Sequence, residues 1–534
     1  MQQLLRISRS FRRSAVLALW LLVAVLLSPF ASAQQPRTAA PAASRLQRRI
    51  RAILEAKEAR QALWGLEVVS VRTGRRLVAF NPDKLFTPAS TAKLFTVAAA
   101  LLRLGPDFTY QTTVETAAPL DNDGRLPGDL VLVGRGDPNL SGRILPYQGR
   151  TERSESPAKV FEELAEQVAQ KGVRVVEGDL VVDDTYFVFQ PYGQGWSMDD
   201  LQWWYGAPVS ALAFNDNVVF IHIQPGNSVG QPAQVRLEPE QSRYAVENRV
   251  VTVPRQREAP GGATRTLERR FTIDRQPGSA VVRLWGEIPE GSAESGEALA
   301  MDDPPRAAGE ALLQELTRRG VEVKGKVQVR RQYPAEAANL REAPAPIPSA
   351  APTVLASRQS LPLAESLKVI LKVSQNLHAE MLLRTLGRQR RTVGSVQAGL
   401  KMVGEFLKEI GLEEGDVALR DGSGLSRQSL VTPSAMVALL RYLYNSPQRG
   451  LWMDLLPMAG TDGSLTERLR GRTTTGRVQA KTGTLTGVAA LAGYAPNRRN
   501  ELFAFALFVN HHTLPNAEAG ALLDRIVEEI AASR

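Results

Sequence analysis

A serine and a lysine three residues apart lie at the start of an apolar stretch of the sequence. The segment TPASTAK, residues 87–93, leads into a run whose apolar residues recur with a helical period. We expect Thr87 to cap this helix and Pro88 to occupy its first turn. A spacing of three places the Lys93 amine on the same helix face as the Ser90 hydroxyl. Because a desolvated lysine can be neutral, Lys93 could take the proton of Ser90 and make that oxygen a nucleophile.

The S-x-x-K pattern alone has little specificity. A second match, Ser156 to Lys159, has a proline after the serine and is better explained as the start of a helix over residues 159–170. Taken by itself, Ser90 could equally be a capping or surface serine. The assignment therefore depends on the rest of the chain.

Two further motifs follow in a fixed order. Ser374-Gln375-Asn376 lies between two helical runs, where a second hydroxyl and an amide could face a cleft. Lys481-Thr482-Gly483-Thr484 follows a short apolar strand, where a lysine and a threonine could hold a carboxylate while the glycine permits close approach of a substrate. The order S-x-x-K, S-x-N, K-T-G is the signature of penicillin-recognising serine enzymes, and a chance triple in this order is improbable.

Beyond these motifs, the sequence resembles the low-molecular-mass class C penicillin-binding proteins, which are D-alanyl-D-alanine carboxypeptidases/endopeptidases. The resemblance covers nearly the whole mature chain. It is carried by residues 88–93, GRGDPNL at 134–140, GDLVVDDTYF at 178–187, DGSGLSR at 421–427, LPMAGTDGSL at 456–465 and AKTGTLTG at 480–487.

The resemblance implies a role for each motif residue. Ser90 would be the nucleophile and Lys93 its general base, while Ser374 would relay a proton to the leaving amine and Asn376 would hold the substrate backbone. The oxyanion hole would be the backbone N–H groups of Ser90 and Thr484, and the terminal carboxylate would meet Lys481 and Thr482 beside Gly483. The substrates would be peptidoglycan peptides and cross-links, β-lactam antibiotics would be covalent inhibitors, and no cofactor or metal is implied.

One further contact is expected from the family. There, an aspartate of the inserted region can contact the free amine of the substrate's diamino acid, and Asp184 in the segment DDTYF is its apparent match. A strand-end turn carboxylate is an equally good explanation, since Asp183 lies beside it and Tyr186 stands where the family commonly has serine. Asp421 and Asp462 are flanked by glycine, so we expect them to shape loops rather than transfer protons.

Three other functions were weighed. A β-lactamase would use the same nucleophile, but no deacylating base is recognisable on a short loop between the second and third motifs. A non-catalytic wall-binding protein is disfavoured because all three motifs are complete. A metallohydrolase is disfavoured because the chain has only His222, His378, His511 and His512 and no H-E-x-x-H motif. His378 is expected to be a hydrogen-bonded packing residue.

The elements around the motifs predict how they are positioned. A helix over residues 45–62 and strands at 64–71 and 76–80 open the chain. Strands at 478–481, 488–494 and 502–509 and a helix at 517–532 close it, so both ends should share one sheet. The resemblance implies an α+β penicilloyl-serine-transferase fold, an antiparallel sheet flanked by helices. We expect catalytic parts at 34–105 and 355–534 and a mostly β insertion at 106–354.

The N-terminus predicts export. Four arginines precede an apolar run from Ala15 to Leu27, and Ala31-Ser32-Ala33 follows as a cleavage site, so residues 1–33 are expected to be a signal peptide. The apolar run is shorter than the roughly 18 to 20 residues of a spanning helix, and no later segment qualifies. The absence of cysteine excludes a thiol nucleophile and suits an extracytoplasmic or periplasmic location.

The charge of the chain is moderate. Loss of the predicted signal peptide lowers the formal net charge from +10 to +6. A modest positive charge suits work near anionic wall polymers, although a solvated basic surface explains it equally well. No basic cluster interleaved with aromatic residues indicates nucleic-acid binding.

Overall fold

The computed structural model describes residues 43–149, 156–239, 243–258, 264–276, 278–334, 352–390 and 394–534. The predicted signal peptide at residues 1–33 lies outside these residues. Among the helices in the described ranges, none has the length and apolar character needed to cross a bilayer.

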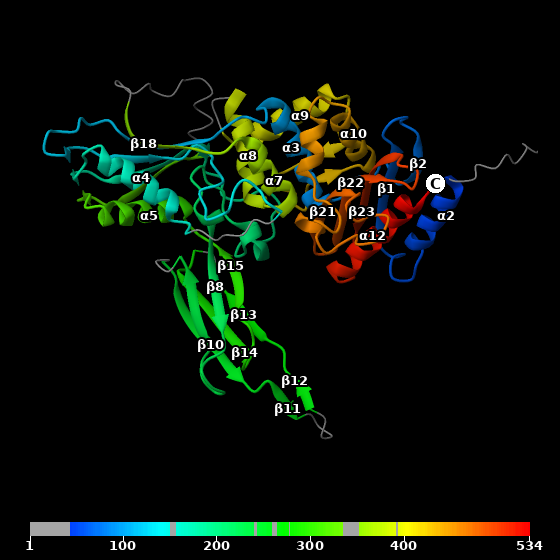
Figure 1. Ribbon diagram of the computed structural model, residues 1–534, viewed down its shortest axis with the longest axis horizontal. Coiled ribbons are helices and arrows are strands. Elements are labelled where there is room, and N and C mark those ends of the chain that lie inside the picture. The colour runs from blue at the N-terminus through cyan, green and yellow to red at the C-terminus, as the bar shows by residue number, and fades with distance from the viewer. Residues whose placement is uncertain are drawn as a thin grey trace, which may run out of the picture. The chain divides into compact units, whose positions relative to one another are not determined.

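The two ends of the chain build one antiparallel sheet of five strands (Figure 1). Leu507 pairs on one side with Leu66 and on the other with Leu491, so the last strands lie between the first strands and the strand of the K-T-G motif. The prediction that both ends share one sheet is confirmed. The strand order is β2-β1-β23-β22-β21, with β1 at Leu63–Ser70, β2 at Arg76–Phe80, β21 at Gln479–Leu485, β22 at Val488–Pro496 and β23 at Leu502–Asn510.

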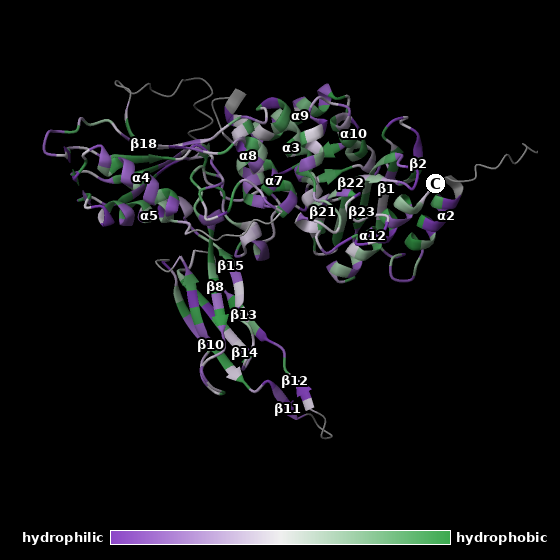
Figure 2. Cartoon of the chain, viewed as in Figure 1, coloured by the Kyte–Doolittle hydropathy of each residue, from purple (hydrophilic) through white to green (hydrophobic). Residues whose placement is uncertain are grey.

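Helices cover both faces of this sheet because its strands are apolar on both faces, as the green colour of β22 and β23 in Figure 2 shows. Leu491 and Leu507 face a core that includes α2 and α12. Ala492 and Phe508 face the opposite core, formed with α3, α8, α9 and α10. These helices are α2 at Ala43–Leu54, α3 at Lys93–Arg103, α8 at Asn376–Arg390, α9 at Val396–Glu409, α10 at Pro433–Tyr444 and α12 at Asn516–Ala532.

The first helix is shorter than predicted. It ends at Leu54, whereas the sequence pattern suggested residue 62. Ala59 is buried, and its carbonyl accepts a hydrogen bond of 2.9 Å from the indole N–H of Trp64. The chain therefore turns between the helix and β1 so that Trp64 reaches the core.

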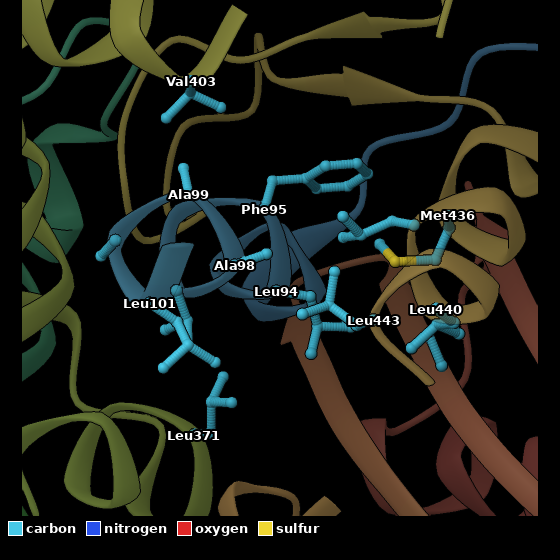
Figure 3. Packing of buried hydrophobic residues seen from close by; sticks show 14 of the residues in the cluster. Leu94, Phe95, Ala98, Ala99, Leu101, Leu371, Val403, Met436, Leu440 and Leu443 are labelled. Carbon is cyan, nitrogen blue, oxygen red and sulfur yellow. The ribbon is translucent and has the colours of Figure 1, made fainter. Parts of the chain in front are cut away.

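The helix that follows Ser90 is held by a dense apolar core. Leu94, Phe95 and Ala98 of α3 are fully buried, and Figure 3 shows them beside Met436 and Leu440 of α10. Full burial of a leucine or phenylalanine side chain stabilises the folded protein by roughly 1.5 to 3 kcal/mol relative to leaving that side chain exposed. The start of α3 is thus a rigid support for the residues that precede it.

The segment between the catalytic motifs is rich in strands. Its largest sheet has the order β17-β7-β5-β3-β18 and packs against α4 and α5. The elements of this segment are β3 at Gln111–Thr116, β4 at Arg125–Leu126, β5 at Leu130–Val133, α4 at Lys159–Gln170, β6 at Val175–Val176, β7 at Leu180–Val188, β8 at Val218–Gln224, β9 at Gln234–Glu238, β10 at Ala245–Val253, β11 at Gln256–Glu258, β12 at Thr264–Thr266, β13 at Arg270–Asp274, β14 at Val281–Pro289, β15 at Ser295–Ala300, α5 at Pro304–Arg318, β16 at Glu322–Val323, β17 at Val327–Gln332 and β18 at Thr353–Gln359.

The two ends of this segment lie side by side. Thr113 of β3 pairs with Ser357 of β18, so the chain leaves and returns on neighbouring antiparallel strands. This adjacency supports our proposal that about residues 106–354 form an insertion within the catalytic unit. β18 itself continues past the proposed boundary to Gln359.

The chain then becomes helical and leads into the S-x-N motif. The helix α7, Leu363–Lys368, continues into a π-helical turn at Val369–Val373, and Ser374 follows with a left-handed φ of 67°. A π-helical turn is frequent at functional sites because it shifts the side chains that follow it. The remaining elements are β19 at Val417–Ala418, β20 at Leu430–Val431 and α11 at Arg449–Leu455.

Candidate active site

Ser90 lies in a 3₁₀ turn rather than in the first turn of an α-helix. The turn spans Ala89–Ala92 and α3 begins at Lys93. Side chains three residues apart eclipse one another in a 3₁₀ turn, which places Lys93 directly beside Ser90. The expectation that Thr87 caps this helix is wrong, because Pro88 precedes the turn without a side-chain cap and the Thr87 backbone N–H donates to Asn510 Oδ1 at 2.8 Å.

The Lys93 amine is fully buried and has three polar neighbours. Its Nζ lies 2.9 Å from Ser90 Oγ, 2.6 Å from Asn376 Oδ1 and 2.8 Å from the Ser423 carbonyl oxygen. An ammonium can donate to all three. A neutral amine can donate to Asn376 and Ser423 and direct its lone pair at the Ser90 hydroxyl, which is the arrangement that a general base requires.

Burial favours the neutral form of this amine. Desolvation lowers the pKa of Lys93 from its ordinary value to about 7, against the opposing effect of the Asp421 and Glu380 carboxylates. A substantial fraction of the lysine is therefore neutral near pH 7 and available to accept a proton.

The carbonyl that faces Lys93 is itself held in place. Glu380 Oε1 accepts hydrogen bonds from the backbone N–H groups of Gly422 and Ser423 at 2.8 and 2.9 Å, and its other oxygen pairs with Arg384 at 3.1 Å. Asp421 accepts from the backbone N–H of Ser426 at 2.7 Å, as expected for a loop-shaping carboxylate. These bonds turn the 421–426 loop so that the Ser423 carbonyl points at the Lys93 amine.

A second lysine faces the serine of the S-x-N motif. Lys481 Nζ is buried and donates to Ser374 Oγ at 2.9 Å and to the Thr482 carbonyl at 2.8 Å. Its pKa is lowered well below the ordinary value by burial, and the positive charges of Lys93 and Arg468 lower it further. Because Ser374 accepts from Lys481, its own hydroxyl proton is free to be donated into the cleft.

The strand β21 approaches the nucleophile closely at Gly483. A Cβ at this position would lie 2.8 Å from the Pro88 carbonyl oxygen and 3.1 Å from the Ser90 backbone nitrogen, so a larger residue would push the strand away from Ser90. Beside it, Thr482 Oγ1 donates to Ser464 Oγ at 2.7 Å. The K-T-G motif is therefore packed against the turn that carries Ser90, with its threonine oriented by the 463–465 turn.

These residues share one cleft of about 340 Å³. Its walls include Ser90, Ser374, Asn376, Thr482 and Thr484. The structure thus brings together every predicted site residue except Asp184, since Lys93, Lys481 and Gly483 contact this set directly.

The cleft also contains charged and aromatic residues that the sequence analysis did not identify. Asp200, Trp204, Tyr205 and Arg427 line it, and Asn376 Nδ2 donates to the Tyr205 carbonyl at 2.8 Å. Burial raises the pKa of Asp200, and the neighbouring Asp199 raises it further, against a hydrogen bond from the Ser197 N–H and the charge of Arg427. The signal for this wall was the dense aromatic and acidic stretch at residues 196–205.

Asp184 lies elsewhere. It is 4% exposed in β7, and its Oδ1 accepts hydrogen bonds from the backbone N–H groups of Ala211 and Leu212 at 2.7 and 3.2 Å. Burial raises its pKa to about 7, although these two hydrogen bonds act in the opposite direction. This environment is that of a carboxylate that holds the chain near residue 211.

Two further residues from the sequence analysis, His378 and Ser156, lie outside the lining of the cleft. His378 is fully buried, and its Nε2 lies 3.1 Å from Asp216 Oδ1, which confirms a hydrogen-bonded packing residue. Ser156 of the second S-x-x-K match is exposed, and its hydroxyl accepts from the backbone N–H of Ala158 at 3.2 Å.

Comparisons with known proteins agree on one family. The model of the D-Ala-D-Ala carboxypeptidase 3 (S13) family matches residues 46–530. The chain is 35% identical over 492 residues to a D-alanyl-D-alanine carboxypeptidase of Actinomadura sp. (strain R39), covering 90% of this chain and 84% of the relative. It is 27% identical over 461 residues to D-alanyl-D-alanine carboxypeptidase DacB of Haemophilus influenzae, covering 85% and 87%.

A solved structure gives the same result. The crystal structure of penicillin binding protein 4 (dacB) from Haemophilus influenzae superposes with a TM-score of 0.72 at 25% identity, covering 91% of this chain and 98% of that one. A second structure of that protein, complexed with a β-lactam, superposes with a TM-score of 0.69. The predicted α+β penicilloyl-serine-transferase fold is thereby confirmed.

Proposed function

Because the chain belongs to the D-Ala-D-Ala carboxypeptidase 3 (S13) family of serine peptidases, we propose that it cleaves peptidoglycan stem peptides and cross-links through an acyl-enzyme on Ser90. One observation carries the proposal. Two buried lysines each contact a serine hydroxyl in a single cleft, Lys93 at Ser90 and Lys481 at Ser374.

The acylation step follows from these contacts. Neutral Lys93 takes the hydroxyl proton of Ser90 while Ser90 Oγ bonds to the carbonyl carbon of the penultimate D-alanine. The negative charge on the carbonyl oxygen meets the backbone N–H groups of Ser90 and Thr484, an effect of roughly a few kcal/mol. The C–N bond then breaks, the leaving nitrogen takes a proton from the Ser374 hydroxyl, and Ser374 takes one from Lys481.

Deacylation returns both lysines to their starting states. A water molecule gives a proton through Ser374 to Lys481 as its oxygen bonds to the ester carbon. The C–O bond to Ser90 breaks, and Ser90 Oγ recovers its proton from Lys93. The cycle consumes one water and releases the shortened peptide.

A free carboxylate on the substrate would favour the protonation states that this cycle needs, an ammonium on Lys481 and a neutral amine on Lys93. Without substrate, burial and the charge of Lys93 disfavour an ammonium on Lys481. A carboxylate bound beside Thr482 and Lys481 would favour that ammonium by direct attraction, while Lys93 stays neutral. Arg427 on the same cleft wall adds a second positive charge. This arrangement supports preference for a substrate with a terminal carboxylate.

Covalent binding of penicillin is part of the proposal. The β-lactam carbonyl would be attacked by Ser90 in the same way, and the Haemophilus influenzae relative has been crystallised with a β-lactam. A β-lactamase would hydrolyse this adduct rapidly. We expect fluorescent penicillin to remain on Ser90 through denaturing electrophoresis, whereas fast nitrocefin turnover without lasting label would support the β-lactamase.

Defined muropeptides test the reaction directly. We expect the purified protein to release D-alanine from pentapeptide muropeptides or to cut the D-alanyl bond of cross-linked dimers, as read by mass analysis of the products. The same digest should locate the acyl group on the peptide that contains Ser90. If the protein performs neither cleavage, the proposal is refuted.

Two acidic residues at the cleft suggest how a diamino acid is selected. Asp200 lines the cleft and Asp199 is exposed next to it, so a cationic amine on the substrate would find negative charge there. Asp184 is less suited to this role because it is only 4% exposed and is not among the residues that line the cleft.

We expect Asp200→Asn to raise KM about tenfold for peptides with a free side-chain amine, since about 1.4 kcal/mol of charge interaction would be lost. The effect should vanish for the same peptides with an acetylated amine, measured by D-alanine release. Asp183→Asn is the matched control, because the half-buried Asp183 pairs with Arg330 at 3.2 Å and is not among the residues that line the cleft. Equal effects on free and acetylated peptides would contradict the assignment to Asp200.

Export to an extracytoplasmic compartment completes the proposal. It is supported by the basic and apolar pattern of residues 1–27 and by the small residues at 31–33. Peptidoglycan is the substrate that such a location would supply. Edman sequencing of the secreted protein should begin at Gln34.

A further inference from the structure

A short turn in the inserted segment has an unusual backbone. Asn215, Asp216 and Asn217 follow one another with φ values of 52°, 54° and 58°. All three values lie in the left-handed region, which residues other than glycine rarely adopt. The two asparagines hold the turn: Asn215 Nδ2 donates to the Val218 carbonyl, and Asn217 Nδ2 donates to the Pro208 carbonyl. A costly conformation held this firmly suggests that the direction of the middle side chain matters.

That side chain is a buried carboxylate directed at the S-x-N motif. Asp216 is 1% exposed, and its Oδ2 accepts from Arg143 Nε at 2.9 Å and from Gln375 Nε2 at 3.3 Å. Its Oδ1 lies 3.1 Å from His378 Nε2, and Arg143 Nη2 also donates to Oδ2. Arg143 and Asp216 belong to the inserted segment, whereas Gln375 directly precedes α8 and His378 lies in its first turn.

Gln375 is the central residue of Ser374-Gln375-Asn376. It is 2% exposed, and its Oε1 accepts from the Leu377 N–H at 3.1 Å, so its amide joins Asp216 to the first turn of α8. On one side of it, Ser374 has its left-handed φ of 67° and contacts Lys481. On the other side, Asn376 contacts Lys93. The two functional side chains of the motif therefore flank a residue anchored in the inserted segment.

We propose that Asp216 and Gln375 are positioning residues, which hold the Ser374 hydroxyl where it can protonate the leaving nitrogen. The inserted segment thereby affects the reaction in the cleft through the buried contact between Asp216 and Gln375. This inference rests on the proposed acyl-enzyme function and deepens it.

Misplacement of the Ser374 hydroxyl should affect different leaving groups to different extents. An amine leaving group must gain a proton as the C–N bond breaks, and general acid catalysis of such steps contributes about 10² to 10⁴-fold. A thiolate leaves without that proton. Misplacing Ser374 should therefore slow cleavage of a D-alanyl-D-alanine peptide far more than cleavage of the corresponding D-alanyl-thioglycolate thioester, which has the same acyl group and a terminal carboxylate.

Gln375→Met tests this directly, because methionine fills the space but cannot join Asp216 to Leu377. We expect kcat/KM for the peptide to fall about 30-fold or more and kcat/KM for the thioester to change by no more than about threefold. The control is Gln359→Met, which removes an exposed side-chain amide bonded to Thr109 and should alter neither substrate. The stoichiometry of penicillin labelling at Ser90 and the Tm report whether the variant is folded.

Asp216→Asn is the second variant and acts from the inserted segment. Its shape is retained, but the charge opposite Arg143 is lost, so some loss of Tm is expected along with the same selective loss on the peptide. Equal losses on both substrates, or no loss with either folded variant, would overturn the inference. If the wild-type protein neither releases D-alanine nor acylates Ser90, the proposed function itself fails, and that result is distinct from either outcome for the variants.

Discussion

Ser90→Ala is expected to remove D-alanine release almost completely, lowering kcat by about 10⁴-fold or more. Alanine leaves the 3₁₀ turn and the oxyanion-hole N–H groups in place, so binding should persist while the covalent step is lost. Among the described residues, the other hydrogen-bond partners of Lys93 Nζ are the Asn376 Oδ1 and Ser423 carbonyl oxygens, and neither carries a proton that the amine could remove. D-alanine release and fluorescent penicillin labelling measure the loss of the covalent step, and equilibrium binding of a pentapeptide muropeptide measures the binding that persists.

The second S-x-x-K match supplies the control for this variant. Ser156→Ala changes the same residue type in the same sequence pattern, but Ser156 is exposed and contacts only its own turn among the described residues. The Ser156→Ala variant should be labelled by fluorescent penicillin and should release D-alanine at the wild-type rate. If Ser90→Ala retained D-alanine release at the wild-type rate, the nucleophile would have to be another residue.

Lys93→Met is expected to lower the acylation rate by about 10² to 10⁴-fold, the usual contribution of a general base. Methionine approximates the volume of the lysine stem but cannot accept the Ser90 proton or bridge Asn376 and Ser423. Stopped-flow measurement of the second-order rate constant for penicillin acylation isolates this step from deacylation. Lys159→Met, in the second S-x-x-K match, should have no effect on this rate constant, since Lys159 begins α4 in the inserted segment.

The same lysine should govern the pH dependence of acylation. Burial lowers the pKa of Lys93 to about 7, and the base works only when neutral. The acylation rate constant should therefore fall tenfold per pH unit well below pH 7. A profile that stays flat from pH 5 to pH 8 would show that a different group accepts the proton.

Several parts of the structure could be predicted from the sequence because they depend on local spacing. Ser90 and Lys93 meet because residues three apart share a face in any helical turn, whether it is α or 3₁₀. The strands predicted at the two ends of the chain indicated that both ends share one sheet, and those strands pair as expected. Errors occurred where a tertiary contact overrode local preference, as where the chain turns at Ala59 to bury Trp64.

The sequence could not identify the partners that complete the site. The third acceptor of Lys93 is the Ser423 carbonyl, 330 residues away, and a backbone carbonyl carries no mark in a sequence because every residue has one. Likewise, Asp184 and Asp200 are both acids, and only the fold decides that Asp184 is buried against the backbone of Ala211 and Leu212 while Asp200 lines the cleft.

Residue types and their order along the chain specify the chemical groups of this protein: a serine beside a lysine, a second serine with an amide, and a lysine on a strand, in an order that few chains share by chance. The tertiary structure decided how those groups are oriented and charged. It buries Lys93 and so brings its pKa near 7, and it anchors Gln375 to Asp216. Desolvation and long-range hydrogen bonds arise only when distant segments pack together, which is why residue spacing alone could not reveal them.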